Sequence, residues 1–369
     1  MSVTARRTLI SDFEVLRDAV QDASLDIMQL GRGRMDGSLL HLAFDSGVGV
    51  STGEFTRAVR SRGSLGGQRW GIGIVFDAPA LMNHVESLPG EIIIFRPNHD
   101  IHARHFGASG YGTVFITPEE LFGYPGAAEA AMLHQPNAVL PDDPAAAAAR
   151  VHTFRWLLSE ISTAAPTMSA GAAEFFRHAF VELVIGPMLE RVEYRKPRIH
   201  QSTAKLVRAV EQYLIEANDR PVHSYELTKA FGIDLGSLQR VFKDETGLGL
   251  IAYQRRQRLS NVHTRLRFGG PDPALSEADL LIKDIAKEHG FIHYSGFTRQ
   301  YQELFGEKPS HTVRRGRRQS ASAGIFRAPN TREPMARIRQ LIERSNTLLK
   351  DAPDTFLGNG ARKKTDEDD

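Results

Sequence analysis

Two arginines and a glutamine have side chains that can form paired hydrogen bonds with a flat, polar partner. Arg240 and Arg299 each lie on the polar side of a short apolar pattern, and Gln239 directly precedes the first of them. A guanidinium group offers parallel N–H donors that match two acceptors on a guanine edge, and a carboxamide matches the donor and acceptor of an adenine edge. These residues therefore predict contacts with DNA bases. For each arginine, a phosphate contact or a surface ion pair is the alternative.

The element that would position Arg299 is a pair of short helices between about residues 282 and 305. One apolar run at helical spacing stops at Gly290, and a second run stops at Gly306. Two short helices joined by a tight turn that contains glycine form a helix-turn-helix unit, whose second helix enters the DNA major groove. The polar face of that second helix carries Tyr294, Ser295, Thr298 and Arg299.

A second copy of this pattern occupies about residues 224–243, where Gly232 supplies the turn and Asp234 is a good N-cap for the following helix. Between the two copies, residues 248–268 have the pattern of one long basic helix. At about 1.5 Å per residue, roughly 20 residues span about 30 Å, close to the ~34 Å between successive major-groove openings on one DNA face. The outward positions of the helix after Asp234 are Ser237, Gln239 and Arg240.

A set of residues spread over both copies matches one family pattern. They are Leu238-Gln239-Arg240-Val241-Phe242, Gly247, Tyr253, Arg258-Leu259, Ile285-Ala286, Gly290-Phe291, Phe297, Tyr301, Phe305-Gly306, Pro309 and Arg314-Arg315. On these residues, about 203–316 of the chain resembles the DNA-binding domain of the AraC/XylS family of bacterial transcription regulators. Thr228 departs from the usual Ala, Leu250 departs from the usual Pro, and residues 269–279 lengthen the loop before the second unit.

The resemblance implies a sequence-specific regulator that binds double-stranded DNA and acts with RNA polymerase. Such regulators often carry a cupin-like β-barrel sensor in front of the DNA-binding domain, and they commonly form homodimers through the helices after the barrel. The resemblance therefore implies a response to a small-molecule effector through the N-terminal domain. The alternative is a regulator whose N-terminal domain serves dimerisation alone and binds no ligand. It implies no cofactor.

The charge of the chain is unevenly distributed. Residues 198–318 hold 20 Lys and Arg against 14 Asp and Glu, whereas residues 1–197 hold 17 against 22. The segment with the paired units is therefore the basic one, as phosphate binding requires. The absence of cysteine excludes disulfides and thiolate chemistry. No run approaches a signal peptide or the ~20 apolar residues of a membrane span, so we expect a cytoplasmic protein without membrane contact.

The expected fold class is α+β with two domains. Short apolar runs punctuated by glycine from about residue 26 to 117 predict an antiparallel sheet or a small barrel. Together with these runs, the resemblance implies that residues 1–197 form a β-barrel-like, cupin-like sensor and dimerisation domain with following helices. Residues 198–318 are expected to form the all-α DNA-binding domain. Residues 319–369 remain as a C-terminal extension with one short helix over 334–349 and a disordered end.

Four further segments carry specific expectations. Residues 8–24 should form an introductory helix, and residues 316–329 a flexible basic arm. Residues 151–161 should present one apolar helix face to the core, and residues 169–192 another.

The rival interpretation is a metal-dependent cupin-type enzyme with an appended helical domain. His99, His102 and His105 are the candidate ligands, but this spacing converges only on a helix. The segment follows the strand-like run EIIIF, so a loop or strand is expected, in which the three side chains would not share a face. The paired histidines and downstream glutamate of metal cupins are missing. We therefore expect no metal site, no catalytic residues and no enzymatic activity.

Overall fold

The computed structural model describes residues 2–322 apart from 21–22, 67, 134–137, 165–166, 191–192, 199–200, 218–219 and 270–277. These residues divide into two compact units. Unit 1 combines the chain up to Arg198 with the described residues from Ala252 onward, and unit 2 contains residues 201–251. The predicted helix at 334–349 and the predicted disordered end lie outside the described residues.

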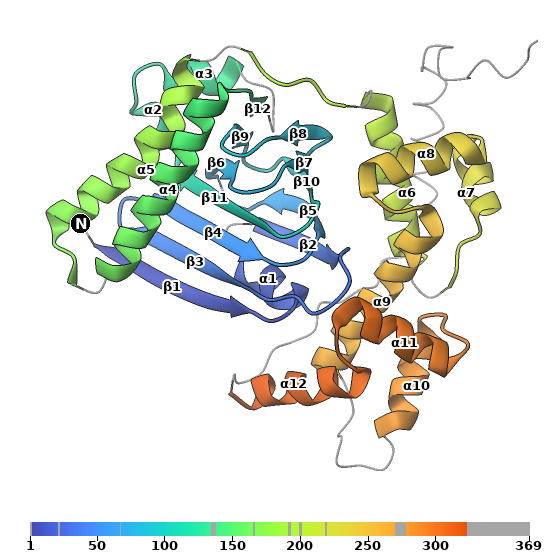
Figure 1. Cartoon of the computed structure of the whole chain (residues 1–369). Helices are drawn as coiled ribbons and strands as arrows, with labels where there is room; N and C mark the ends of the chain where they lie inside the picture. The colour runs from blue at the N-terminus through green and yellow to red at the C-terminus, as the bar shows by residue number, and fades with distance from the viewer. Residues whose placement is uncertain are drawn as a thin grey trace, which may run out of the picture. The chain divides into compact units, whose positions relative to one another are not determined.

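Unit 1 is built around two antiparallel sheets (Figure 1). In the described part of the chain one sheet has the order β1-β3-β4-β11-β6-β9-β12, and the other has the order β2-β5-β10-β7-β8. The strands are β1 (Val3–Ile10), β2 (Ala23–Gln29), β3 (Gly37–Phe44), β4 (Gly49–Phe55), β5 (Val59–Leu65), β6 (Trp70–Val75), β7 (Ala80–Met82), β8 (Val85–Ser87), β9 (Ile92–Phe95), β10 (Asp100–His105), β11 (Ser109–Ile116) and β12 (Val139–Leu140).

The two sheets share an apolar core but do not close into a barrel. Leu65 and Ile101 from the smaller sheet pack with Val75, Ile93 and Phe115 from the larger one. Closure would require hydrogen bonds between the edge strands of the two sheets. Within the described strands, β1 pairs with β3 alone and β2 with β5 alone. The α+β class and the β-rich N-terminal part are confirmed, whereas the barrel-like expectation is corrected to an open pair of sheets.

The helices that follow the sheets in the chain cover one face of the larger sheet (Figure 1). Their buried faces include Phe154 and Ile161 on one helix and Phe180 and Met188 on the next, which confirms the two predicted apolar faces. These two helices are α4 (Pro144–Ala164) and α5 (Ala170–Glu190), and the shorter α2 (Pro118–Phe122) and α3 (Ala127–Leu133) precede them.

The predicted helix over residues 8–24 is wrong in its extent. Residues 3–10 form β1, which pairs along its whole length with β3. The helix α1 spans only Phe13–Ala19, because the Asp12 side chain caps its first turn and the next strand begins at Ala23. The short amphipathic run thus forms a helix, but the residues before and after it pair with other strands and do not extend that helix.

Four more helices complete unit 1 and its connection to unit 2: α9 (Leu250–Gly269), α10 (Ala278–Glu288), α11 (Tyr294–Phe305) and α12 (Pro309–Ser322). The predicted flexible arm from residue 316 is wrong over 316–322, which continue α12. The absence of a side chain at Gly316 lets α12 pack closely against the backbone of α9 at Arg267. A Cβ atom at this position would fall 2.0 Å from the Arg267 carbonyl oxygen. Unit 2 contains α6 (Gln201–Glu216), α7 (Ser224–Phe231) and α8 (Leu235–Thr246). None of the described helices is long and apolar enough to cross a membrane.

Candidate DNA-binding interface and its supporting contacts

The first helix-turn-helix unit, α7 and α8, forms as the sequence predicts. Gly232 ends α7 in the left-handed region at φ 62°, where glycine avoids the steric cost of a side chain. Asp234 then caps α8, because its carboxylate accepts a hydrogen bond from the backbone N–H of Ser237 at 2.8 Å. Leu227 and Leu238 are buried from the two sides of the turn. The local sequence therefore sets the angle at which α8 leaves the turn.

The polar face of α8 presents two of its three predicted DNA contacts to solvent. Gln239 and Arg240 are exposed, and neither forms a hydrogen bond or ion pair within the described residues. Ser237 is half-buried, and its backbone N–H belongs to the Asp234 cap. The N-terminal half of a recognition helix is the part that reaches base edges, and all three residues lie there.

The second unit, α10 and α11, has the same plan and a buried aromatic core. Its turn contains Gly290 at φ 77°, and Gly306 ends α11 at φ 70°. Arg258 of α9 donates a hydrogen bond to the Gly290 carbonyl at 3.1 Å and lies over the Phe291 ring at 5.0 Å. Tyr301 is fully buried among aromatic neighbours. The turn is therefore held by both packing and hydrogen bonding.

The four predicted contact residues of α11 divide into two pairs. Ser295 and Arg299 are exposed and form no hydrogen bond or ion pair with described residues. Thr298 is half-buried and donates to the Tyr294 carbonyl at 2.9 Å. The Tyr294 ring packs on Phe297 at 6.0 Å between centroids. Ser295 and Arg299 are thus the side chains that solvent reaches most freely, and Tyr294 and Thr298 also support the helix.

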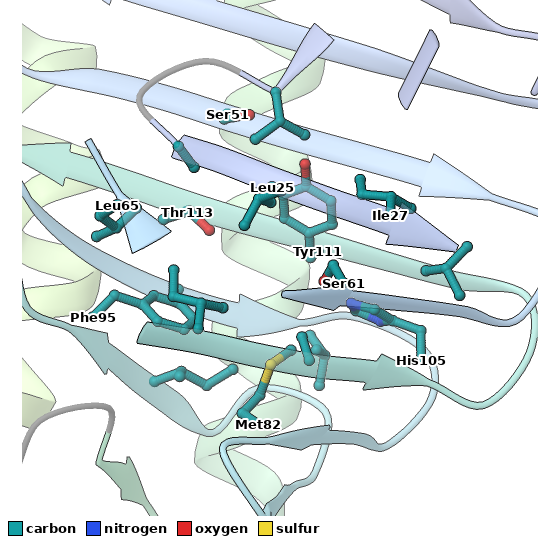
Figure 2. A pocket seen from close by; sticks show the side chains of 18 of the residues that line it. Leu25, Ile27, Ser51, Ser61, Leu65, Met82, Phe95, His105, Tyr111 and Thr113 are labelled. Carbon is teal, nitrogen blue, oxygen red and sulfur yellow. The ribbon is translucent and has the colours of Figure 1, made fainter. Parts of the chain in front are cut away.

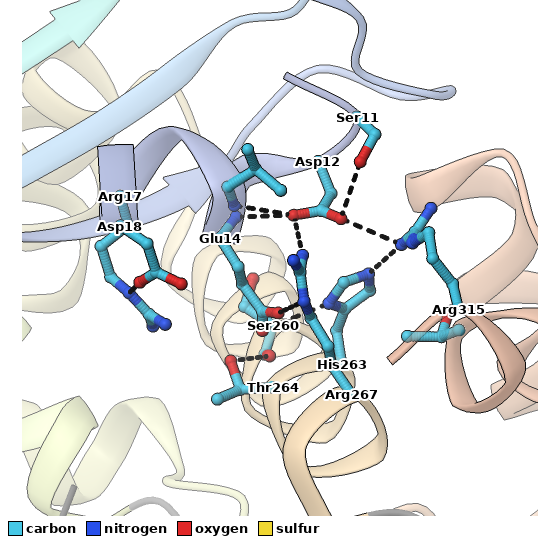
Figure 3. A network of polar contacts seen from close by, with 12 residues as sticks. Ser11, Asp12, Glu14, Arg17, Asp18, Ser260, His263, Thr264, Arg267 and Arg315 are labelled. Carbon is cyan, nitrogen blue, oxygen red and sulfur yellow. Dashed lines mark hydrogen bonds and ion pairs between the residues drawn. The ribbon is translucent and has the colours of Figure 1, made fainter. Parts of the chain in front are cut away.

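A buried network of charged side chains joins α1 to the helices around the second unit (Figure 3). Asp12 accepts two backbone N–H bonds from the first turn of α1, at 3.0 and 2.9 Å. Its carboxylate also pairs with Arg267 of α9 and, at 3.1 Å, with Arg315 of α12. Glu14, fully buried, lies 3.3 Å from Arg267 Nε and 3.3 Å from His263 Nδ1. These contacts tie the N-terminal part of the chain to α9 and α12.

Glu307, which precedes α12, completes the network. Its carboxylate accepts hydrogen bonds from Arg315 at 2.8 and 3.0 Å and lies 3.8 Å from His263 Nε2. Burial disfavours a charged imidazole, but the carboxylates of Glu14, Glu307 and Asp12 outweigh that effect and raise the pKa of His263 to about 9. Three carboxylates therefore face three basic side chains. Sequence reasoning missed the network, because Asp12 and Arg267 are 255 positions apart.

A cavity lies between the two sheets of unit 1 (Figure 2). Its volume is about 110 Å³, and most of its lining is aliphatic or aromatic. Burial lowers the pKa of His105 to about 4, so its imidazole is uncharged at neutral pH. Burial raises the pKa of Tyr111 to about 12, with the nearby Ser51 hydroxyl opposing it weakly. The polar residues in the lining are Ser51, Ser61, His105, Tyr111 and Thr113.

The three histidines of the rival metal hypothesis do not gather into one site. His102 and His105 belong to β10 and, three residues apart, point to opposite faces of the strand, while His99 precedes it. The expectation of a loop or strand is confirmed. Among the described residues, no group of three His, Cys, Asp or Glu side chains is placed to hold a metal ion.

Sheets followed by paired helix-turn-helix units, with exposed arginines on both second helices, define a two-domain DNA-binding regulator. A helix-turn-helix domain model matches residues 227–315. A probable AraC family transcriptional regulator from Rhodopseudomonas palustris CGA009 is 34% identical over 30% of this chain and 96% of that chain, with a TM-score of 0.26. The chain belongs to the AraC family of transcriptional regulators.

Two further solved structures are similar over longer spans at low identity. The AraC-like transcriptional activator CuxR is 13% identical over 75% of this chain and 99% of that chain, with a TM-score of 0.36. ToxT from Vibrio cholerae is 10% identical over 85% of this chain and 99% of that chain, with a TM-score of 0.26.

Proposed function

We propose that this AraC-family regulator reads its DNA site with both second helices, α8 and α11, and responds to a small molecule held between its sheets. The observation that carries the proposal is the pair of exposed arginines, Arg240 and Arg299. Each lies opposite the buried face of its helix and forms no ion pair within the described residues. An arginine that forms no hydrogen bond or ion pair with described residues is available for a guanine edge or a phosphate.

The two parts of DNA binding have different physical sources. Lysines and arginines of residues 198–318 would contact phosphates and release counterions, which supplies sequence-independent affinity. Discrimination between sequences would come from Ser237, Gln239 and Arg240 on α8 and from Tyr294, Ser295, Thr298 and Arg299 on α11. A bidentate contact from an arginine or glutamine is worth about 1–3 kcal/mol against the wrong base. The 20 residues of α9 correspond to about 30 Å, so we propose that the two helix-turn-helix units enter successive major-groove segments.

The remaining partners follow from the same proposal. The effector site is the cavity between the sheets, because it is concave and mainly apolar and contains a few convergent polar groups. We include RNA polymerase as a partner and homodimerisation through the helices after the sheets. We place the protein in the cytoplasm, without a cofactor or catalytic activity. The proposed boundary between sensor and DNA-binding domain stays at residues 197–198, and the second helix-turn-helix unit also packs on the sensor sheets.

Footprinting of the full chain on the DNA upstream of its own gene tests the proposal. Arg299→Ala should remove protection from one half-site and Arg240→Ala from the other, each weakening specific binding about 5- to 150-fold. Arg6→Ala removes the same charge from the exposed strand β1 and is the matched control. A footprint that both recognition-helix variants leave unchanged would exclude sequence reading by these helices.

A further inference from the structure

We propose that the cavity takes a compact, uncharged and mainly apolar molecule with one hydroxyl or carbonyl group, and that α1 transmits its binding to the second helix-turn-helix unit. The inference rests on the proposed function, because it takes the cavity as the effector site. It adds the chemical class of the ligand and the path of the signal.

The ligand class follows from the lining of the cavity. Among the described residues that line it, none is Asp, Glu, Lys or Arg. A charged ligand would lose its hydration there without gaining a counter-charge, which is a severe cost in an apolar site. The volume of about 110 Å³ resembles the ~150 Å³ apolar cavity known to admit a benzene ring. A molecule near that size therefore fits by both charge and volume.

The polar end of the ligand has a defined place in the cavity. The Ser51 hydroxyl is buried, and it lies beside the Tyr111 hydroxyl, whose pKa it lowers as a hydrogen-bond partner. Tyr111 and His105 point into the same space and are uncharged at neutral pH (Figure 2). One ring nitrogen of His105 is already taken, because Nδ1 lies 3.0 Å from Ser109 Oγ. Neutral donors and acceptors of this kind select a hydroxyl or a carbonyl rather than a carboxylate.

The signal path follows from two different ends of the same short helix. Leu16, in the middle of α1, and Val20, which caps the C-terminal end of α1, line the cavity. Asp12 and Glu14, at its other end, belong to the buried network with α9 and α12. Because α1 has only seven residues, its ends are rigidly connected, and a ligand that packs on Leu16 also restrains the two carboxylates.

A shared core reinforces this connection. Leu16, Phe55 and Val59 line the cavity and pack in the same apolar cluster as Leu304 and Phe305 of α11. The cavity and the network are both formed in this structure. A ligand that fills the cavity therefore stabilises the arrangement in which α9 and α12 are tied to α1. Linkage makes the effect reciprocal, so breaking the network must weaken ligand binding.

Three probes of matched shape test the ligand class: toluene, benzyl alcohol and benzoate, with affinity for the full chain measured by saturation-transfer NMR. Toluene and benzyl alcohol should bind, and benzoate should bind at least about tenfold more weakly. Tyr111→Phe should weaken benzyl alcohol about 3- to 10-fold and leave toluene unchanged, because it removes a single hydrogen bond. Benzoate binding as tightly as benzyl alcohol, or no binding by any probe at millimolar concentration, overturns the assignment.

The signal path is tested with the same probes and a second pair of variants. Glu14→Gln should weaken both toluene and benzyl alcohol at least about fivefold, whereas Asp18→Asn, an exposed carboxylate on the same helix, should change neither. If Glu14→Gln does not fold, Arg315→Gln breaks the network from α12 and should act in the same way. Equal probe affinity in wild type and a folded network variant refutes transmission through α1. These measurements of probe binding need no DNA. A footprint that Arg299→Ala leaves unchanged would count against the proposed DNA contacts. That result is distinguishable from a failure of the probes to bind, which counts against the ligand assignment.

Discussion

The buried imidazole of His263 makes the stability of unit 1 depend on pH in a predictable direction. Its pKa is raised from an ordinary value of 6.5 to about 9. A group whose pKa is raised by folding stabilises the folded state below its unfolded pKa, and this stabilisation is lost as the pH rises through the folded pKa. The loss should therefore fall between about pH 6.5 and pH 9. At about 1.4 kcal/mol for each pKa unit, the full effect is about 3 kcal/mol.

The surroundings of His263 support both the direction of this pH dependence and the pH range over which it occurs. Glu14, Asp12 and Glu307 favour the imidazolium, while Arg267 and Arg315 compensate those carboxylates. Burial would raise the pKa of Asp12 and of Glu307, but the neighbouring cations and hydrogen bonds lower both below their ordinary values. Both therefore remain ionised across the window. The stacked Tyr301 stays neutral there, because burial raises its pKa well above 10.

Urea unfolding followed by tryptophan fluorescence measures the effect. Both tryptophans of the chain, Trp70 and Trp156, lie in unit 1, so their signal reports that unit. The wild type should lose about 3 kcal/mol of unfolding free energy between pH 6.5 and pH 9 relative to His263→Gln. His99→Gln, which removes an exposed histidine, should behave as wild type. A wild-type stability that stays level or rises over this range, or that falls equally in His263→Gln, would refute the reasoning.

Three further predictions concern the helix-turn-helix units. Gly232→Ala should lower the unfolding free energy by about 1–2 kcal/mol through the left-handed backbone alone, since no atom lies within 4 Å of its Cβ position. Gly306→Ala should lower it further, because its Cβ would fall 2.5 Å from the Arg34 backbone nitrogen. Urea unfolding followed by circular dichroism compares the two variants, and equal losses would contradict the close contact at Gly306. Asp234→Ala should lower the unfolding free energy of unit 2 by about 1 kcal/mol through loss of the cap, a change absent if Ser237 N–H is satisfied otherwise. The affinity of the full chain for its DNA site should fall steeply and log-linearly with salt concentration, and a flat salt dependence would exclude multiple phosphate contacts.

The helix-turn-helix units were predictable because their determinants are local. The Asp234 cap spans three residues, the left-handed turn at Gly232 needs one, and the buried face of α11 follows the 3.6-residue period. Recognition-helix residues such as Arg240 and Arg299 could be chosen for the same reason. On an amphipathic helix, the face that the apolar residues leave free is known before any neighbour is placed.

The tertiary structure alone decided the role of the chain's first twenty residues. Their sequence permits one helix, but β1 and α1 form instead because β3 supplies a pairing edge and Asp12 stops the helix from extending backward. The partners of Asp12 and Glu14 lie about 250 positions away on α9 and about 300 positions away on α12, and no local pattern encodes that proximity. The carboxylates around His263 shift its pKa upward, whereas burial shifts the pKa of His105 downward, although both are histidines in unremarkable sequence. The protonation of each imidazole depends on which carboxylates and apolar walls folding brings to it, which is a property of the three-dimensional arrangement.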